Sequence, residues 1–335
     1  MASTDEISKV KENSKGNLLA MQNVVGVGVG YKVKDGQQTD DYSIVVMVSK
    51  KLPLAALTPQ AVLPKNISGV KIDVIEVGEL HALQVRTNRW RPAPAGVSIG
   101  HYKITAGTFG SIVRDRITKE RFILSNNHVL ANSNDAKPGD AILQPGPIDG
   151  GSSDNDTIAY LERFCPIEFA SEPGSCEIAD TYARVGNTLA SWMGSKHRIN
   201  TLQTDPQAVN LVDAAVAKPI QDSDVLDEIL EIGEIQGTAT GQLGMSVRKS
   251  GRTTSFTTGK ISLINATVDI NYGGSRTARF ENQLVSGPMS QGGDSGSLVV
   301  AGDSLLAVGL LFAGSAQSTI FNPIQPVLDC LEIEI

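Results

Sequence analysis

Cysteine and aromatic residues are scarce in this sequence of 335 residues. Aromatic residues make up 5% of the chain, and there are three cysteines, Cys165, Cys176 and Cys330. Because three is a small and odd number, these cysteines do not indicate a disulfide framework and are typical of a protein in a reducing compartment. None of them forms a Cys-x-x-Cys pair, and the four histidines are scattered. We therefore expect no metal site and no cofactor.

Basic charge and long apolar runs are also lacking. The net charge of −7 leaves no broad basic surface, so nucleic acid is not an expected partner. No stretch is apolar over a length that would span a bilayer, so we expect no membrane partner either. The first six residues are polar and acidic and differ from the charged-then-apolar layout of a secretory signal, which favours a cytoplasmic location.

The residues that are abundant indicate a β-rich globular protein with many turns. There are 33 glycines and 15 prolines, and 41% of the residues are hydrophobic. Since one ordinary domain has ~150 residues, the length predicts two or three units.

Residues 1–88 are expected to form a small α/β domain with a regulatory, pro-domain or assembly role. Any homo-oligomer is expected to form through it. The patterns predict a polar helix over 5–19, strands over 23–33, 43–48 and 70–77, a turn at 35–36 and a short helix near Leu57. Glycines alternate with β-branched residues in the first strand, but no helix follows, which favours a closely packed strand over a nucleotide loop. The Pro/Ala/Gly-rich stretch 89–96 reads as an exposed connection between domains.

Residues 89–335 are expected to be mainly β, with a helical insertion near 150–205. Strands are predicted over 106–113, 121–124, 140–145, 210–217, 246–254, 258–264, 267–272 and 305–314, and a closing helix near Asp329. Within the insertion, apolar residues recur at three- and four-residue steps from Ile178 to Met193. This spacing predicts an amphipathic helix, which we expect to pack on the main body.

The stretch Gly292-Gly293-Asp294-Ser295-Gly296-Ser297 precedes the apolar run 298–300. Glycines on both sides of a serine allow a tight turn and let a ligand approach main-chain N–H groups. Ser295 could act there as a nucleophile, with the N–H groups of Gly293 and Ser295 as an oxyanion hole. A Gly/Ser loop that only enters a strand is the alternative. A serine nucleophile also needs a base and an acid.

His128 and Asp213 are the candidates for base and acid. His128 ends a buried-looking strand at a pair of asparagines, where a lone histidine is otherwise a hydrogen-bonded structural residue. Asp213 is the one carboxylate in an apolar strand, and a buried carboxylate needs a partner. That partner is either a backbone N–H, an arginine, or the Nδ1–H of His128, whose orientation it would fix.

The order His128, Asp213, Ser295 and the settings of these residues resemble the chymotrypsin-like (trypsin-fold) serine peptidases. In that family a histidine ends a strand of the first β-barrel, and the serine lies in a Gly-Asp-Ser-Gly loop of the second. The resemblance covers residues 97–335. It implies a double antiparallel β-barrel and a serine endopeptidase that forms an acyl-enzyme on a protein or peptide substrate. Ser295 would be the nucleophile, His128 the general base and then acid, and Asp213 the orienting carboxylate.

The sequence departs from this family in several places. Ser125-Asn126-Asn127 precedes the histidine where secreted relatives have Thr-Ala-Ala, and the cysteines typical of those relatives are absent. These departures fit an intracellular, bacterial-type branch with an extra N-terminal domain. Two alternatives stay open, which are an inactive trypsin-fold scaffold that binds partners and an esterase with the same three residues.

The resemblance also implies a substrate pocket and an activation mechanism. The pocket base would be Met289, six residues before the serine, with Phe312, Ala313 and Gly314 on one wall. An uncharged base predicts a preference for small or medium apolar side chains, unless the insertion covers the cleft and Met289 is only core. In relatives activated by cleavage, the residue equivalent to Asp294 pairs with a new N-terminus. Cleavage near Arg89 and Arg91 could supply one here, or Asp294 pairs with an internal arginine or caps backbone N–H groups.

Overall fold

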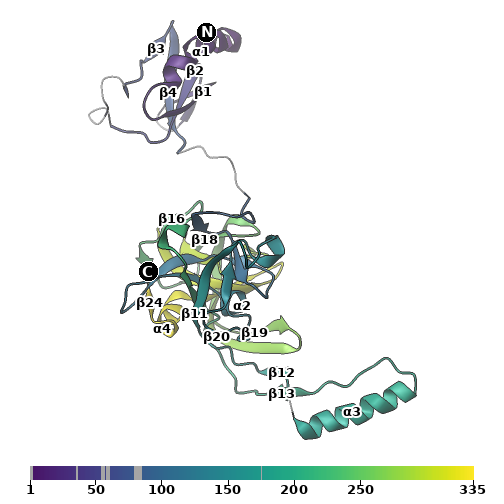
Figure 1. Cartoon of the computed structure of the whole chain (residues 1–335). Coiled ribbons are helices and arrows are strands. Elements are labelled where there is room, and N and C mark those ends of the chain that lie inside the picture. Colours follow the sequence, from purple (N-terminus) through teal and green to yellow (C-terminus); the bar gives the residue numbers. More distant parts are fainter. Residues whose placement is uncertain (1–2, 35–36, 54–56, 58–60, 79–84, 175) are drawn as a thin grey trace. The chain divides into compact units, whose positions relative to one another are not determined.

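The computed structural model describes residues 3–34, 37–53, 57, 61–78, 85–174 and 176–335. The chain divides into two compact units, Met1–Gln84 and Val85–Ile335 (Figure 1). The predicted boundary at residue 88 falls a few residues after this division. The turn predicted at 35–36 and the flanks of the helix predicted near Leu57 lie outside the described residues.

The first unit is a four-stranded sheet with one helix. Its elements are α1 (Thr4–Leu19), β1 (Val24–Lys34), β2 (Gln37–Val48), β3 (Asn66–Ile67) and β4 (Val70–Glu76), with the strand order β1-β2-β4-β3. Ser3 and Glu6 form a capping box that starts α1. The apolar side chains of α1 are buried with those of β2 and β4, which forms the core of the unit. The glycine-rich segment is part of strand β1, as the sequence predicts.

The second unit begins with a curled antiparallel sheet of eight strands, in the order β24-β8-β9-β14-β11-β10-β6-β7. Its strands are β6 (Ser98–His101), β7 (Gly107–Thr108), β8 (Ser111–Asp115), β9 (Arg121–Ser125), β10 (Ala141–Leu143), β11 (Thr157–Phe164), β14 (Ala215–Pro219) and β24 (Ile333–Glu334). β7 ends the sheet on one side and β8 lies near its other side, yet only two residues join them. The sheet must therefore curl round on itself.

The second sheet closes into a barrel. It runs β13-β12-β20-β19-β18-β21-β22-β17, and β23 pairs with both β20 and β22. Its strands are β12 (Ser171–Pro173), β13 (Leu202–Thr204), β17 (Gly237–Thr238), β18 (Ser246–Gly251), β19 (Ser255–Gly273), β20 (Arg276–Ser286), β21 (Leu298–Ala301), β22 (Leu306–Gly314) and β23 (Thr319–Pro323). The double pairing of β23 joins six strands into a ring. The predicted fold class, mainly β with two antiparallel barrels after a small α/β unit, is confirmed.

The remaining elements connect or cover these sheets. They are β5 (Ala93–Ala95), α2 (Asn127–Leu130), the 3₁₀ helix η3 (Pro147–Asp149), α3 (Glu177–Trp192), the 3₁₀ helix η4 (Asp222–Asp224), β15 (Val225–Ile229), β16 (Gly233–Glu234) and α4 (Ile324–Cys330). Within the described residues, no helix has the length and apolar character needed to cross a membrane.

The stretch 89–96 is not the exposed connection that its composition indicated. Ala93 and Ala95 are fully buried in β5, which pairs in parallel with β15. Alanine and glycine are small enough for close packing as well as for linkers, so their presence does not distinguish the two. Arg91 donates from Nη1 to the side-chain oxygen of Gln144 at 2.7 Å and so fixes the start of this segment.

The insertion helix forms as predicted, but its expected packing on the main body is wrong. Figure 1 shows α3 standing out from the second unit beyond β12 and β13. Of its side chains, Ala183 is the buried one, whereas Tyr182 is 76% and Trp192 82% exposed. The amphipathic pattern predicts an apolar face that needs a partner, but it does not say whether that partner belongs to the same chain. The described residues hold no partner for that face.

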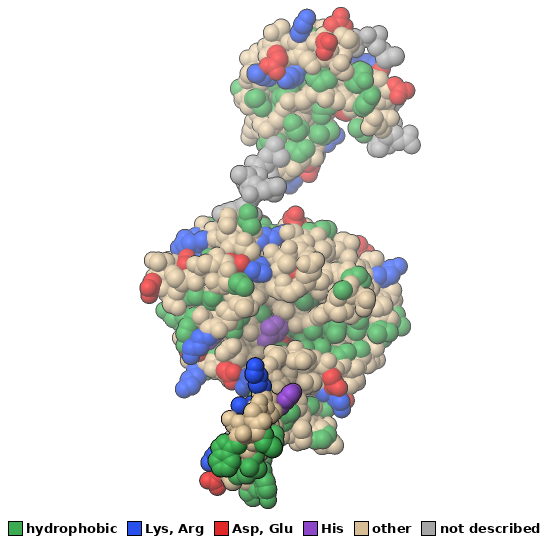
Figure 2. Space-filling view, turned by 90° about the vertical axis from the view of Figure 1, so that its right-hand side faces the viewer, with side chains coloured by type: hydrophobic (Ala, Val, Ile, Leu, Met, Phe, Trp, Pro, Cys, Tyr) green, Lys and Arg blue, Asp and Glu red, His purple; other side chains and the backbone are tan. Residues whose placement is uncertain are grey.

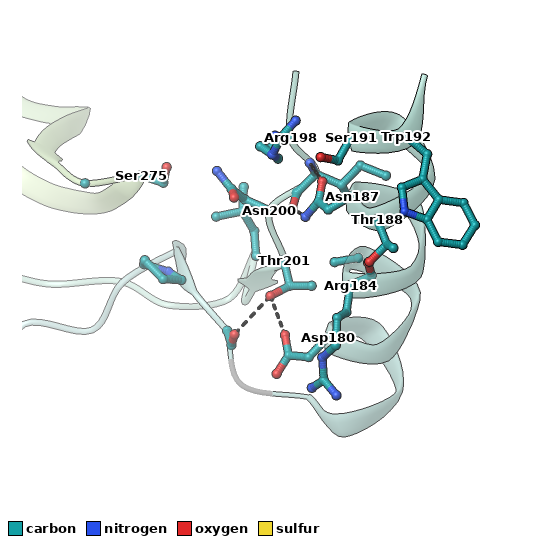
Figure 3. A pocket seen from close by; sticks show the side chains of 16 residues that line it. Asp180, Arg184, Asn187, Thr188, Ser191, Trp192, Arg198, Asn200, Thr201 and Ser275 are labelled. Atoms are coloured by element: carbon teal, nitrogen blue, oxygen red, sulfur yellow. Dashed lines mark hydrogen bonds between the residues drawn. The ribbon is translucent and has the colours of Figure 1, made fainter. Parts of the chain in front are cut away.

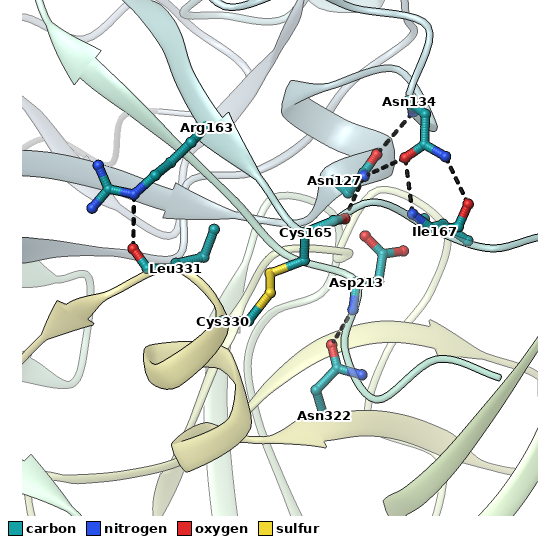
Figure 4. Close-up of a disulfide and its surroundings, with 9 residues drawn as sticks. All are labelled: Asn127, Asn134, Arg163, Cys165, Ile167, Asp213, Asn322, Cys330 and Leu331. Atoms are coloured by element: carbon teal, nitrogen blue, oxygen red, sulfur yellow. Dashed lines mark hydrogen bonds between the residues drawn. A yellow bond between two sulfur atoms is a disulfide. The ribbon is translucent and has the colours of Figure 1, made fainter.

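The cysteines also differ from the expectation, because Cys165 and Cys330 form a disulfide (Figure 4). It joins the segment after β11 to the end of α4. Cys165 accepts a hydrogen bond from Asn127 Nδ2 at its carbonyl and donates its N–H to Ala214 O. Two of the three cysteines are therefore paired, and the third, Cys176, is free and exposed. Disulfides persist in oxidising compartments, so this one does not favour the cytoplasmic location, which stays a prediction.

Candidate active site

The loop that contains Ser295 is a tight turn, and its backbone conformation requires glycine on each side of the serine. Gly293 and Gly296 both have φ of +95°, in the left-handed region. A Cβ on Gly296 would also lie 2.0 Å from Ser125 Oγ and 2.4 Å from Thr108 O. The loop is held by Thr108 of β7, whose N–H donates to Ser295 O at 2.7 Å and whose hydroxyl donates to Gly293 O at 2.9 Å. The first sheet therefore fixes the loop of the second.

His128 lies in the short helix α2, directly after β9. Asn127 anchors this helix, because its side-chain amide donates to Asn134 Oδ1 and to Cys165 O, both at 2.8 Å. The imidazole keeps 22% of its surface exposed and faces the cleft that also contains Ser295.

Asp213 is fully buried and carries the partners that its burial requires. Its Oδ2 accepts from His128 Nδ1 at 2.6 Å, and its Oδ1 accepts from the His128 N–H at 3.2 Å. Asn126 Nδ2 donates to its carbonyl, and its own N–H donates to Asn322 Oδ1. The predicted strand over 210–217 starts only at Ala215 in β14, so Asp213 lies just before a strand rather than within one. This arrangement orients the imidazole through its Nδ1–H.

Tyr272 is a third member of this group that the sequence analysis did not identify. Its hydroxyl donates to Asp213 Oδ2 at 2.8 Å, and its ring contacts the His128 ring edge-on at 5.8 Å between centroids. Burial, together with the charge and the hydrogen bond of Asp213, raises the pKa of Tyr272 well above its ordinary value of 10. The hydroxyl therefore stays a proton donor throughout the neutral range. A tyrosine beside two glycines at a hairpin tip gave no sign of this role.

Ser295 and His128 line one cleft of about 1310 Å³. The Ser295 hydroxyl lies 3.4 Å from Phe312 O, and among the described residues it makes no hydrogen bond with the imidazole. Such bonds are often long before substrate binds, so this geometry is compatible with a serine that His128 deprotonates.

The proposed oxyanion donors, the N–H groups of Gly293 and Ser295, have no hydrogen-bond acceptor within the described chain. By contrast, the N–H groups of Asp294, Gly296 and Ser297 each donate to a backbone carbonyl. Unpaired main-chain donors on both sides of a glycine-flanked serine can stabilise a negatively charged oxygen.

The residues predicted to form a substrate pocket all line the same cleft. They are Met289, Phe312, Ala313 and Gly314. Met289 is also 3% exposed and packs in the core of the second barrel, so it is both a core residue and a wall of the cleft. No lining residue comes from the insertion at 150–205, so in the described chain the insertion does not cover the cleft.

Asp294 pairs with an internal cation, which is a lysine, whereas an arginine was one of the alternatives left open by the sequence. Its Oδ2 lies 3.2 Å from Lys249 Nζ, and both side chains are fully buried. It also accepts from the N–H groups of Gln291, Thr253 and Thr254 and from the Thr254 hydroxyl. Burial by itself would raise the pKa of Asp294, but the charge of Lys249 and these hydrogen bonds outweigh it and lower the pKa. The carboxylate is thus satisfied in the uncut chain.

No family model matches the chain, and no curated protein matches it. Solved structures do. The Nocardiopsis protease NAPase is 14% identical, with 72% of this chain and 98% of that chain covered and a TM-score of 0.46. A glutamic acid-specific serine protease is 18% identical over 72% and 100%, with a TM-score of 0.46. Thermobifida fusca protease A is 16% identical over 72% and 98%, with a TM-score of 0.44. Likeness at this level carries no argument about activity.

Proposed function

We propose that this protein is a serine endopeptidase that hydrolyses peptide bonds in protein or peptide substrates. The observation that carries the proposal is the pairing of His128 Nδ1 with the buried Asp213 Oδ2 at 2.6 Å in the cleft that also exposes Ser295. A purely structural histidine would not need a buried carboxylate on one nitrogen and an open cleft at the rest of its ring.

In the proposed reaction, Ser295 Oγ attacks the carbonyl carbon of the peptide bond while His128 takes the hydroxyl proton. The tetrahedral oxyanion is stabilised by the N–H groups of Gly293 and Ser295. His128 then gives the proton to the leaving nitrogen, the carbon–nitrogen bond breaks, and an ester to Ser295 remains. Water attacks this acyl-enzyme with His128 again as base, which releases the new carboxylate and restores the serine. Asp213 stabilises the imidazolium in each half of the reaction.

We propose further that the chain is active without proteolytic cleavage. The Lys249–Asp294 pair supports this, because Asp294, the residue that would pair with a new N-terminus, already has a buried counter-charge in the uncut chain. Intact mass spectrometry of the active protein tests it. An active chain that still starts at its original N-terminus supports the proposal, and activity found only after a cut near Arg89 or Arg91 contradicts it.

The function itself is tested with matched peptide and ester substrates that share the same acyl group. Hydrolysis of both by the wild type, and of neither by the Ser295→Ala variant, supports a peptidase. Hydrolysis of esters alone would assign the same residues to an esterase. No hydrolysis of either substrate would leave a binding scaffold.

A further inference from the structure

The outer face of α3 carries large apolar side chains with no partner in the described chain. They are Ile178, Tyr182, Val185, Leu189 and Trp192, each between 49% and 82% exposed. Their spacing follows steps of four, three, four and three residues, which is the repeat of a helix that packs lengthwise on another helix. Figure 2 shows apolar side chains gathered on this projecting element.

The opposite face of α3 is already occupied, so the orientation of the helix is fixed. Asn187 donates from Nδ2 to Ile199 O and accepts from the Ile199 N–H, and Asp180 accepts from the Thr201 hydroxyl (Figure 3). Gly186 lets Ile199 approach closely, since a Cβ there would lie 2.7 Å from Ile199 Cδ1. In Figure 3 Trp192 points away from this return segment. The helix is thus held by its polar side and presents its apolar side outward.

We propose that α3 is a self-association surface on which α3 of a second copy of this chain packs in the antiparallel direction. With the two-fold axis at Val185, Ile178 comes opposite Trp192 of the second copy, and Tyr182 opposite Leu189 of the second copy. Ile178 and Trp192 each lie seven residues from Val185, whereas Tyr182 lies three and Leu189 four residues from it, so the inner pair is within one residue of register.

The charges at the two ends of α3 are complementary in this arrangement. Glu177 lies in the first turn, whereas Lys196 follows the last turn. An antiparallel pair brings the acidic end of one helix within about one turn, ~5 Å, of the basic end of the other. A parallel pair would instead put like charges side by side, which is unfavourable.

The area and composition of the face also fit a second copy. The exposed parts of its five apolar side chains and Met193 amount to roughly 800 Å², which is the area per partner of a standard protein interface. A membrane surface fits less well, because membrane-bound helices carry lysine and arginine on the polar face. Here that face has Glu177 and Asp180 against one cation, Arg184.

Sedimentation velocity of the full chain over a range of concentrations tests the association. We expect a reversible monomer–dimer equilibrium whose dissociation constant rises at least ~100-fold in the Val185→Glu, Leu189→Glu double variant, since the seam would bury unpaired carboxylates. Ile117→Glu is the matched control, because Ile117 is 87% exposed outside the insertion. A wild type that stays monomeric, or a dimer that the double variant leaves intact, would overturn the proposal. Ser295→Ala should dimerise normally, so the result is independent of the proposed enzyme activity.

Oxidative cross-linking tests the direction of packing without perturbing the seam charge. Val185→Cys in a Cys176→Ser background should form a dimer-linking disulfide, because Val185 meets its own copy at the axis. The native Cys176 should not link to its counterpart, which would lie ~27 Å away along the antiparallel pair. Efficient Cys176 cross-linking would show a parallel pair and contradict the proposal.

Charge reversal separates a second copy from other partners. Glu177→Lys and Lys196→Glu should each weaken the dimer about threefold, and the two together should restore it. Restoration requires that both ends meet in one complex of identical chains. Failure to restore it, or binding of the chain to anionic vesicles in place of dimer formation, would contradict the second copy as the occupant.

Discussion

Tyr272 donates its hydroxyl to Asp213 Oδ2, the same carboxylate oxygen that accepts from His128 Nδ1. The hairpin of β19 and β20 therefore reaches the proposed catalytic group from the second barrel. Asp213 Oδ2 therefore accepts from two groups: the His128 imidazole, which must gain and lose a proton during the reaction, and the Tyr272 hydroxyl, which stays protonated. We interpret Tyr272 as a positioning residue that fixes Asp213 and moderates its charge.

Tyr272→Phe should lower kcat by about 10- to 100-fold, because it removes a hydrogen bond worth about 1.5–3 kcal/mol that positions the charged Asp213, while the ring packing is retained. The remaining charge on Asp213 would stabilise the imidazolium more strongly. The acid limb of the kcat/KM profile against pH should therefore move to higher pH. A loss of activity with an unchanged pH profile would indicate a merely structural role for Tyr272.

The three central residues should behave as one unit. Ser295→Ala and His128→Ala should each remove nearly all hydrolysis, and the double variant should be no worse than either single variant. Asp213→Asn should reduce turnover by about 10⁴ if the proposed site works as the Ser-His-Asp triad of trypsin does. Steady-state kinetics on a peptide substrate measures these effects in the single variants and in the double variant. Additive losses in the double variant would mean that the residues act separately.

Much of this site could be predicted from the sequence, because the residues next to Ser295 and Asp213 in the chain already indicate their roles. Ser295 lies in a turn that needs its glycines, and Asp213 is a carboxylate in an apolar segment that had to find a partner. Tyr272, Asn322 and Lys249 could not be predicted in the same way. Their roles depend on which strands the two barrels bring together, and the residues next to them in the sequence do not indicate these contacts.

The insertion shows a different limit of the sequence. Its periodicity correctly predicted a helix, because spacing is a local property of the chain. The same periodicity could not tell whether the apolar face meets the body of the chain or another molecule. The prediction of an exposed connection over 89–96 was wrong for a related reason, because small residues occur both in linkers and in tightly packed strands.

Loss of the buried cation should be costly. Lys249→Met leaves Asp294 buried without its counter-charge, which costs about 3–5 kcal/mol of unfolding free energy and distorts the serine loop. Adding Asp294→Asn removes the unpaired charge and should recover part of the stability. Urea unfolding of the single and double variants gives the coupling free energy. A coupling near zero would show that the two side chains do not depend on each other.

The same pair predicts a dependence of stability on pH. The folded-state pKa of Asp294 lies below its ordinary value of 3.8, so its contribution to stability is fully present above that pH. The contribution is lost as the pH falls through the folded-state pKa. The wild type should therefore lose stability below about pH 4 more steeply than the Lys249→Met, Asp294→Asn variant. Equal slopes in urea unfolding from about pH 5 to 2 would argue against an ionised Asp294.

Met289, which the family resemblance puts at the base of the substrate pocket, predicts the primary specificity. With this uncharged side chain there, the wild type should cut after small or medium apolar residues, with each methylene changing discrimination by about 1–3 kcal/mol. Met289→Asp should shift the preference toward lysine and arginine. A peptide library varied before the scissile bond measures both. A wild type that cuts after lysine or arginine as fast as after leucine or alanine would show that the pocket lies elsewhere.

The most direct test of the central claim is covalent labelling with a fluorophosphonate, followed by peptide mass spectrometry. The probe reacts only with a serine that a neighbouring base activates. We predict stoichiometric labelling of the wild type at Ser295, and no labelling of Ser295→Ala or His128→Ala. Equal labelling of the wild type and Ser295→Ala, or no labelling of a folded wild-type protein, would contradict the assignment of Ser295, His128 and Asp213 as a catalytic triad.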